Sequence, residues 1–273
     1  MSSGPHTVTV APGIEQIEGF FPSGVVALQT TRAGGVSLPP FDSFNLGSHV
    51  GDAPEAVTAN RARLADHLPS APSWLSQVHG IAAVDHDQSA LNEQTALKEQ
   101  TADACFTGQA NRVCAVMTAD CLPVLIARED GQQVGIAHAG WRGLCAGVIE
   151  NTLTQMLARD QQGAQQTWLF WLGPAIGPRT FEVGSEVRAA FITAEASADQ
   201  AFTPSASGVQ KWLADLGLLA QQRIERFADQ HALAGWRIGG HAECTVERPE
   251  KYFSYRRDGK TGRMASLIYF RPI

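Results

Sequence analysis

Short, continuous apolar runs are the feature that most constrains this chain. Six runs of five to seven residues are apolar along most of their length and alternate little with polar residues: 24–30, 112–117, 121–127, 133–138, 168–172 and 264–270. Strands that are covered on both faces have this pattern, whereas a strand with one face in water alternates. The chain is therefore expected to bury its sheets between other layers.

Helical patterns lie between several of these runs. Four segments carry them: 51–68, 143–159, 184–193 and 209–229. The first is expected to begin at Asp52 as its N-cap, with Pro54 in the first turn. Two polar segments are expected to be exposed, 88–101 as a loop or short helix and 194–208 as a connection. The whole pattern predicts a mixed α and β fold with sheets lying under helices.

Composition excludes several classes of protein. The 273 residues are 44% hydrophobic and 18% charged, and the net charge is −6 without any Lys/Arg block, so nucleic acid is not an expected partner. No apolar run approaches the roughly 20 residues that span a bilayer, and the first residues lack the pattern of a signal peptide. Five cysteines in a chain of this length argue against a disulfide framework. A reduced, cytoplasmic protein without membrane association is expected.

Cys121, which follows Asp120 directly, has three interpretations: a buried core residue, a nucleophile or a metal ligand. His79 lies where a strand is expected to open into a turn, and His138 closes another strand. Side chains at strand ends face clefts, where functional sites collect. Two imidazoles and one thiolate suit zinc and would leave a fourth position open, as in catalytic zinc sites. The three residues form no local motif, so spacing alone leaves the three interpretations open.

Polar, glycine-rich segments are further candidates for ligand binding. Arg32 lies in "TRAGGVS", Asn45 in "FDSFNLGSHVGD" and Arg256 in "FSYRRDGKTGRMA". Each segment could be plain turn chemistry, and the last could be a hairpin with solvated charges. The functional alternative is a set of arginines that face a phosphate or carboxylate.

Seven motifs in one order give a more specific indication. "TTRAGGVS" and "FNLGSHVGD" precede "SQVHG", "TADCLPVLIA", "GIAHAGWRGL", "GPAIGPRTFEVGSEV" and "YFSYRRDGKTGRMASLIYF". Together they resemble the YfiH/YlmD family, also called the laccase-domain or multicopper polyphenol oxidase family, which includes peptidoglycan editing factors and human FAMIN. The motifs run from about residue 24 to 271. The resemblance implies one domain over residues 1–273, an α+β fold with mixed sheets in a four-layer α/β/β/α sandwich, and a monomer.

The resemblance also implies a metal site and an activity. The family's ligands match His79, Cys121 and His138, with zinc as the expected ion and copper possible in the same site. The implied activity is zinc-dependent purine nucleoside phosphorolysis with adenosine deamination, on adenosine, inosine, guanosine and methylthioadenosine. Copper-dependent polyphenol oxidation is one alternative, and a peptidoglycan precursor editing hydrolase with a cysteine nucleophile is another. His49 and Cys244 are expected to border the site without binding metal.

Physical chemistry ranks these activities. A multicopper oxidase needs a second, histidine-rich centre built from His-x-His pairs, and this sequence has no such pair. Deamination needs a carboxylate that moves a proton, for which Asp120 is nearest, although it could instead orient a ligand. Phosphorolysis needs a bound phosphate, which Arg142 at a helix start is predicted to hold. Arg32, Asn45 and Arg256 are predicted to bind the substrate.

Overall fold

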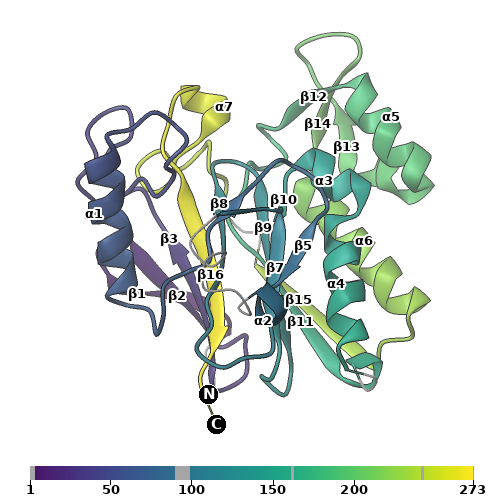
Figure 1. Ribbon diagram of the computed structural model, residues 1–273. Helices are drawn as coiled ribbons and strands as arrows, with labels where there is room; N and C mark the ends of the chain where they lie inside the picture. The colour runs from purple at the N-terminus through teal and green to yellow at the C-terminus, as the bar shows by residue number, and fades with distance from the viewer. Residues whose placement is uncertain (1–3, 90–98, 161–162, 241–242, 273) are drawn as a thin grey trace.

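The computed structural model describes residues 4–89, 99–160, 163–240 and 243–272, with two large sheets at its centre (Figure 1). The first sheet has five antiparallel strands, in the order β1 (His6–Ala11), β2 (Ile14–Glu18), β3 (Val25–Thr30), β16 (Met264–Phe270) and β8 (Cys114–Thr118). The second sheet has six strands, in the order β15 (Gly235–Gly240), β11 (Thr167–Leu172), β9 (Leu122–Arg128), β10 (Val134–Ala139), β7 (Ala104–Thr107) and β5 (Ala83–Asp85). Its two outermost pairs are parallel, which makes the sheet mixed.

The six apolar runs all form strands of these two sheets. They become β3, β8, β9, β10, β11 and β16, and every residue of β8, β9, β10 and β16 is buried. Residues of β8 and β16 pack against residues of β9, β10 and β11 in one apolar cluster between the sheets. Burial on both faces explains why these strands lack alternation.

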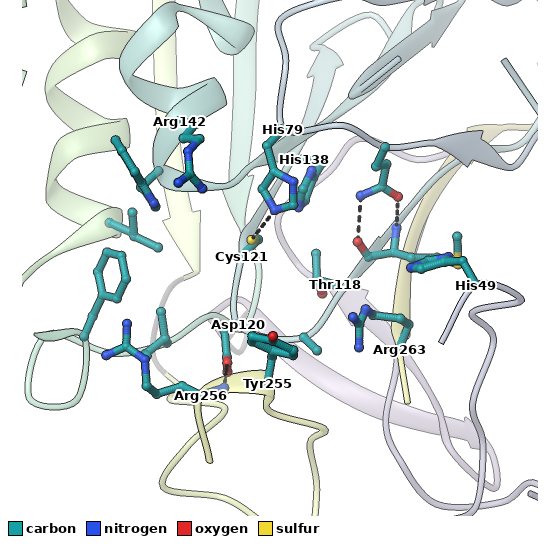
Figure 2. Close-up of a pocket in the computed structure, with 17 residues that line it drawn as sticks. His49, His79, Thr118, Asp120, Cys121, His138, Arg142, Tyr255, Arg256 and Arg263 are labelled. Carbon is teal, nitrogen blue, oxygen red and sulfur yellow. Dashed lines mark hydrogen bonds between the residues drawn. The ribbon is translucent and has the colours of Figure 1, made fainter. Parts of the chain in front are cut away.

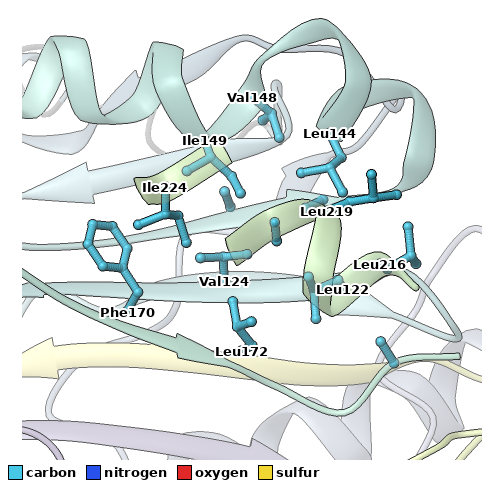
Figure 3. Packing of buried hydrophobic residues seen from close by; sticks show 14 of the residues in the cluster. Leu122, Val124, Leu144, Val148, Ile149, Phe170, Leu172, Leu216, Leu219 and Ile224 are labelled. Atoms are coloured by element: carbon cyan, nitrogen blue, oxygen red, sulfur yellow. The ribbon is translucent and has the colours of Figure 1, made fainter. Parts of the chain in front are cut away.

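Seven helices cover the sheets or connect them among the described residues: α1 (Pro54–Ala65), α2 (His86–Ser89), α3 (Trp141–Ala146), α4 (Val148–Ala158), α5 (Ser185–Ala194), α6 (Leu216–Gln230) and α7 (Tyr255–Asp258). Two 3₁₀ segments add to them, η1 (Gly163–Gln165) and η2 (Ala196–Ala201). Figure 3 shows α4 and α6 placing Ile149 and Ile224 over Val124 and Phe170 of the six-stranded sheet. Burying side chains of this size contributes about 1.5–3 kcal/mol each. None of the described helices is long and apolar enough to cross a bilayer.

The other large sheet is covered by α1. Leu64 of this helix is fully buried in a cluster with Leu28 of β3 and Leu267 of β16. Two small sheets complete the fold, one of β12 (Glu182–Gly184), β14 (Lys211–Ala214) and β13 (Phe202–Pro204), and one of β4 (Leu75–Ser76) and β6 (Gln100–Thr101). The prediction of a mixed α+β fold with several sheets is confirmed.

Two helix predictions were wrong in detail. The stretch 143–159 is two helices, because Gly147 adopts a left-handed conformation with φ 102° that ends α3 and begins α4. The stretch 209–229 starts as β14, and α6 begins only after Asp215, whose carboxylate accepts a hydrogen bond from the Leu218 amide at 3.0 Å.

Three other local predictions need correction or have only partial coverage. The N-cap of α1 is Ala53, and the Asp52 carboxylate instead accepts hydrogen bonds from Ser37 and from the side-chain amide of Asn45. The predicted connection 194–208 contains η2 and β13. Most of the predicted polar loop 88–101 lies outside the described residues.

Candidate functional site

Three side chains from separate segments converge at one end of the six-stranded sheet. Cys121 immediately precedes β9, His138 lies near the end of the neighbouring β10, and His79 follows β4. The Cys121 Sγ lies 3.7 Å from the His79 Nε2, and one ligand atom from each residue lies within 4.8 Å of the others. Figure 2 shows the two imidazoles and the thiol pointing toward one another. Tetrahedral zinc holds nitrogen and sulfur ligands about 3.5–3.8 Å apart, so this donor set fits the ion.

Asp103, directly before β7, anchors two of these segments. Its carboxylate lies 2.8 Å from the His138 Nδ1 and accepts hydrogen bonds from the backbone amides of Val78, His79 and Gly80 at 2.6–3.2 Å. The side chain is fully buried. A carboxylate on Nδ1 leaves Nε2 of His138 free to bind a metal, which is the usual arrangement behind a histidine ligand. Sequence reasoning missed Asp103, although an aspartate directly before a buried strand is a usable signal.

The protonation states of the cluster are coupled. Burial alone would raise the pKa of the Cys121 thiol, but His138 and His79 lower this pKa to about 6. Burial alone would lower the pKa of His138, but the Cys121 thiolate and Asp103 raise this pKa to about 9. Near neutral pH the metal-free site therefore holds a thiolate beside an imidazolium.

Close backbone approach keeps the cluster compact. A Cβ atom at Gly140 would lie 2.7 Å from the His79 Cδ2 and 3.0 Å from the Cys121 Sγ, so a side chain at this position would push the ligands apart. His79 itself has φ 60°, a left-handed conformation that non-glycine residues rarely adopt. The amide hydrogen bonds to Asp103 hold this turn in place.

The cluster opens into a cavity of about 560 Å³. Its lining is shared by aromatic, cationic and polar side chains: Trp141, Phe181 and Tyr255, then Arg142, Arg256 and Arg263, and also His49, Gln77, Thr118 and Asp120. The volume is in the range of small-molecule sites. Figure 2 shows Arg142 beside the histidine pair and Arg263 across the cavity, beyond Thr118.

Asp120 lines this cavity, but its carboxylate is already engaged. One oxygen accepts a hydrogen bond from the Thr245 hydroxyl at 2.6 Å, and the other accepts one from the Arg256 amide at 2.6 Å. Asp120 has φ 94°, which is not a strand conformation, so the rule that neighbouring side chains in a strand point to opposite faces does not apply to it. The carboxylate thus ties the start of α7 to the loop that carries Cys121.

The three cavity arginines differ in their partners. The Arg256 guanidinium donates hydrogen bonds to the carbonyls of Thr180 and Glu182. Arg263 is half-buried, and burial lowers its pKa. Within the part of the chain that the structure describes, neither Arg142 nor Arg263 has a carboxylate within ion-pair distance. Arg142 is exposed and stacks on the Trp141 ring at 4.6 Å.

A buried hydroxyl also faces the cavity. Thr118 is 1% exposed, and among the described residues its Oγ1 has no hydrogen-bond partner. Buried polar groups are nearly always paired, so an unpaired one that lines a cavity suits a bound polar group. Sequence reasoning missed Thr118, Arg263 and Tyr255, although the last two lie in the motif that contains Arg256.

Two predicted substrate-binding residues lie outside the cavity lining. Arg32 donates to the backbone carbonyls of Asp42 and Pro249, and Asn45 is buried with hydrogen bonds to Gly47 and the Arg263 amide. Both side chains organise loops, because their polar atoms are already satisfied. The lining does include His49 but not Cys244, whose thiol accepts a hydrogen bond from the Gly177 amide.

The sequence is similar to a protein family and to purine nucleoside phosphorylases of bacteria. A family model described as "Multi-copper polyphenol oxidoreductase laccase" matches residues 26–271. The purine nucleoside phosphorylase YfiH of Escherichia coli (strain K12) is 49% identical over 250 residues, which cover 91% of this chain and 95% of that protein. The purine nucleoside phosphorylase PA4543 of Pseudomonas aeruginosa is 45% identical over 250 residues, which cover 92% and 95%.

Solved structures agree with the fold. The Neisseria meningitidis protein NMB0706 is 40% identical, with a TM-score of 0.83 over 95% of this chain and 100% of that one. YlmD from Geobacillus stearothermophilus is 27% identical, with a TM-score of 0.82 over 98% and 100%. The chain therefore belongs to the multi-copper polyphenol oxidoreductase laccase family, the YfiH/YlmD family that its motifs resemble.

Proposed function

We propose that this protein is a zinc-dependent purine nucleoside phosphorylase. The observation that carries the proposal is one cavity that combines a His–Cys–His cluster, aromatic walls and guanidinium groups that have no carboxylate partner among the described residues. Relatives with 45–49% identity are named purine nucleoside phosphorylases, which supports the same chemistry here. His79, Cys121 and His138 would hold the ion, which would supply Lewis-acid chemistry at the reacting centre.

The reaction needs a phosphate and a nucleoside side by side. A phosphate oxygen attacks C1′ of the ribose, and the purine leaves with the electrons of the broken C1′–N bond. We propose that Arg142 binds the phosphate, with Arg263 and the unpaired Thr118 hydroxyl as a second contact across the cavity. Trp141, Phe181 and Tyr255 offer ring faces on which a purine can stack.

Two further residues are proposed to position this machinery. Asp103 orients His138 and the turn that carries His79. Arg256 shapes the wall beside Phe181, over which its guanidinium lies at 5.5 Å. Asp120 remains a candidate proton carrier for adenosine deamination, but it would have to release a 2.6 Å hydrogen bond to act, which favours a positioning role.

Purified protein tests the proposal directly. Bound zinc is quantified, and inosine or adenosine is followed with and without phosphate. We expect hypoxanthine or adenine, together with ribose 1-phosphate, only when phosphate is present. Cys121→Ser is expected to abolish turnover, while Cys145→Ser, on α3 outside the cavity lining, keeps it. Zinc-loaded protein that turns over no purine nucleoside would refute the proposal.

The phosphate contact is tested by paired variants. Arg142→Gln and Arg263→Gln are each compared with wild type by the KM for phosphate at saturating nucleoside. Loss of a charged contact of this kind costs about 1.5–3 kcal/mol, or roughly 10–150-fold in KM. The variant with the larger rise in the KM for phosphate identifies the residue that holds phosphate. A wild-type KM in both variants would exclude both arginines as phosphate ligands.

The finer assignments are part of the same proposal. We propose zinc as the resident ion, adenosine deamination as a side activity, a cytoplasmic monomer and a four-layer arrangement of the helices and sheets. The family description favours a second candidate, copper-dependent phenol oxidation, and activity that appears only after copper loading would favour it. A cysteine hydrolase that edits peptidoglycan precursors would survive chelation, whereas the proposed zinc enzyme loses activity.

A further inference from the structure

A second histidine–cysteine cluster lies inside the protein, apart from the cavity. His86 begins α2, Cys105 lies in β7 and Cys114 lies in β8. The two strands belong to different large sheets, so the cluster bridges the layer between them. One ligand atom from each of the three residues lies within 4.8 Å of the others. His86 is 4% exposed, and both cysteines are fully buried.

An unpaired ring nitrogen gives an independent indication. In the described parts of the chain, the His86 Nδ1 has no hydrogen-bond partner. A buried polar atom without a partner costs about 1–3 kcal/mol, so such atoms are uncommon in proteins. The cluster is packed among apolar side chains that include Leu75, Ala102 and Val116. The Cys105 side chain lies within hydrogen-bond reach of the imidazole. Both cysteines are free thiols and do not form a disulfide.

We propose that His86, Cys105 and Cys114 form a second metal site, which binds zinc and joins the two sheets. Two thiolates and an imidazole are a preferred donor set for a thiophilic ion. A divalent ion on two thiolates forms a neutral group, which a fully buried site favours over a charged one. Ligand atoms within 4.8 Å need to move by at most about 1 Å to reach the spacing of a tetrahedral site.

The position of the cluster implies a structural role. The Arg112 guanidinium donates a hydrogen bond to the backbone carbonyl of His86, and the neighbouring Asp87 pairs with Arg159 at 2.5 Å. These contacts fix the segment that carries the imidazole against the start of β8 and the end of α4. A metal there would cross-link segments from both sheets without reaching the cavity, whose lining contains none of the three residues.

Metal content in a background without the first site tests the proposal separately from the catalytic one. Cys121→Ser protein is loaded with zinc, passed through a desalting column and analysed for bound metal. We expect one zinc per chain, and none in the double variants Cys121→Ser/His86→Asn and Cys121→Ser/Cys105→Ala. The matched control Cys121→Ser/Cys145→Ala is expected to keep the ion, because Cys145 lies on α3 outside the cluster.

Cobalt substitution gives a readout that does not depend on activity. Cobalt bound to the Cys121→Ser protein should show thiolate-to-metal charge-transfer absorption, which is lost with Cys105→Ala and retained with Cys145→Ala. Circular dichroism and the melting temperature establish that each variant is folded. Folded Cys121→Ser protein without zinc and without this absorption overturns the proposal, and binding of copper(I) but not zinc overturns the assignment to zinc. Phosphorolysis is not measured, so failure here leaves the proposed activity untouched.

Discussion

Asp103→Asn is the substitution that most directly tests how the proposed metal site is held. The Asp103 carboxylate is fully buried and serves four groups: the His138 Nδ1 and the backbone amides of Val78, His79 and Gly80. All four are donors, which an ionised carboxylate satisfies through its two oxygens. Ionisation is favoured, because although burial would raise the pKa of Asp103, the hydrogen bonds from His138 and Gly80 lower it.

Asparagine can satisfy only part of this set. Its side chain has one acceptor oxygen and an NH₂ group that only donates. If the oxygen stays with His138 and His79, the NH₂ group faces the amides of Gly80 and Val78, and two donors lose their acceptor. At about 1–3 kcal/mol for each unpaired buried donor, the variant should lose about 2–6 kcal/mol of unfolding free energy. Misplacement of the ligands should also weaken zinc binding about 10–100-fold.

Urea unfolding with a chelator present measures the first effect, and competition against a zinc indicator measures the second. Asp42→Asn is the matched control, because the Asp42 side chain is 48% exposed in its ion pair with Arg32. An exposed pair is worth about 0–1 kcal/mol, so the control should keep its stability and its zinc affinity. An Asp103→Asn protein with wild-type unfolding free energy and wild-type zinc affinity would show that the carboxylate does not organise the site.

Four further predictions follow from the structure. Gly140→Ala should weaken zinc binding about 10-fold or more in the same competition assay, because the added Cβ would press on His79 and Cys121. Gly108→Ala is the control and should keep the zinc affinity, because its added Cβ would make only ordinary contacts at 3.5 Å or beyond. Zinc affinity should rise about tenfold per pH unit between pH 6.5 and 9. In this range His138, whose pKa is raised to about 9, has to release a proton before it binds zinc, whereas Cys121, whose pKa is lowered to about 6, is already a thiolate. A zinc affinity that does not change with pH would contradict these protonation states. The unfolding free energy of the metal-free protein should change little between pH 6.5 and 9. The stabilising contribution of Cys121 is lost as pH falls through about 6, and that of His138 is lost as pH rises through about 9. Between these two pKa values the two contributions change with pH in opposite directions and cancel. Leu153→Ala, in the core between α4 and the sheet, should cost about 2–5 kcal/mol of unfolding free energy in urea, and a cost below 1 kcal/mol would mean that this core is loosely packed.

The strands could be predicted because their signal is local. In the run 264–270, Ser266 is the one polar position among otherwise hydrophobic residues, and burial on both faces explains this near absence of alternation. Helix boundaries were less accessible, because a single glycine such as Gly147 is compatible with a continuous helix until its φ is known. The start of α6 depends on whether 211–214 pairs with other strands, and a sequence pattern does not contain that pairing.

The candidate site shows a similar division. The residue types of His79, Cys121 and His138 and their motifs indicated a shared site, and these side chains do lie together in the structure. Asp103 was not found, because its partners come from the turn at 78–80 and from β10, and only the folded chain brings them together. Arg32 was chosen by residue type, but residue type does not say where a guanidinium points, and this one is engaged by backbone carbonyls.

Backbone strain beside the ligands explains why two buried carboxylates are needed. His79 and Asp120 both have positive φ, at 60° and 94°, and such conformations cost about 1–3 kcal/mol each and persist only where surrounding contacts impose them. Asp103 holds the first through three backbone amides, and the Asp120 carboxylate holds the second through Thr245 and an amide of α7. Because both turns are held by protein groups, the ligand atoms are close together before any ion binds, so little chain entropy is lost when zinc binds. Zinc should therefore bind without a large change in secondary structure. A circular dichroism spectrum that changes substantially on zinc addition would argue against this pre-organisation.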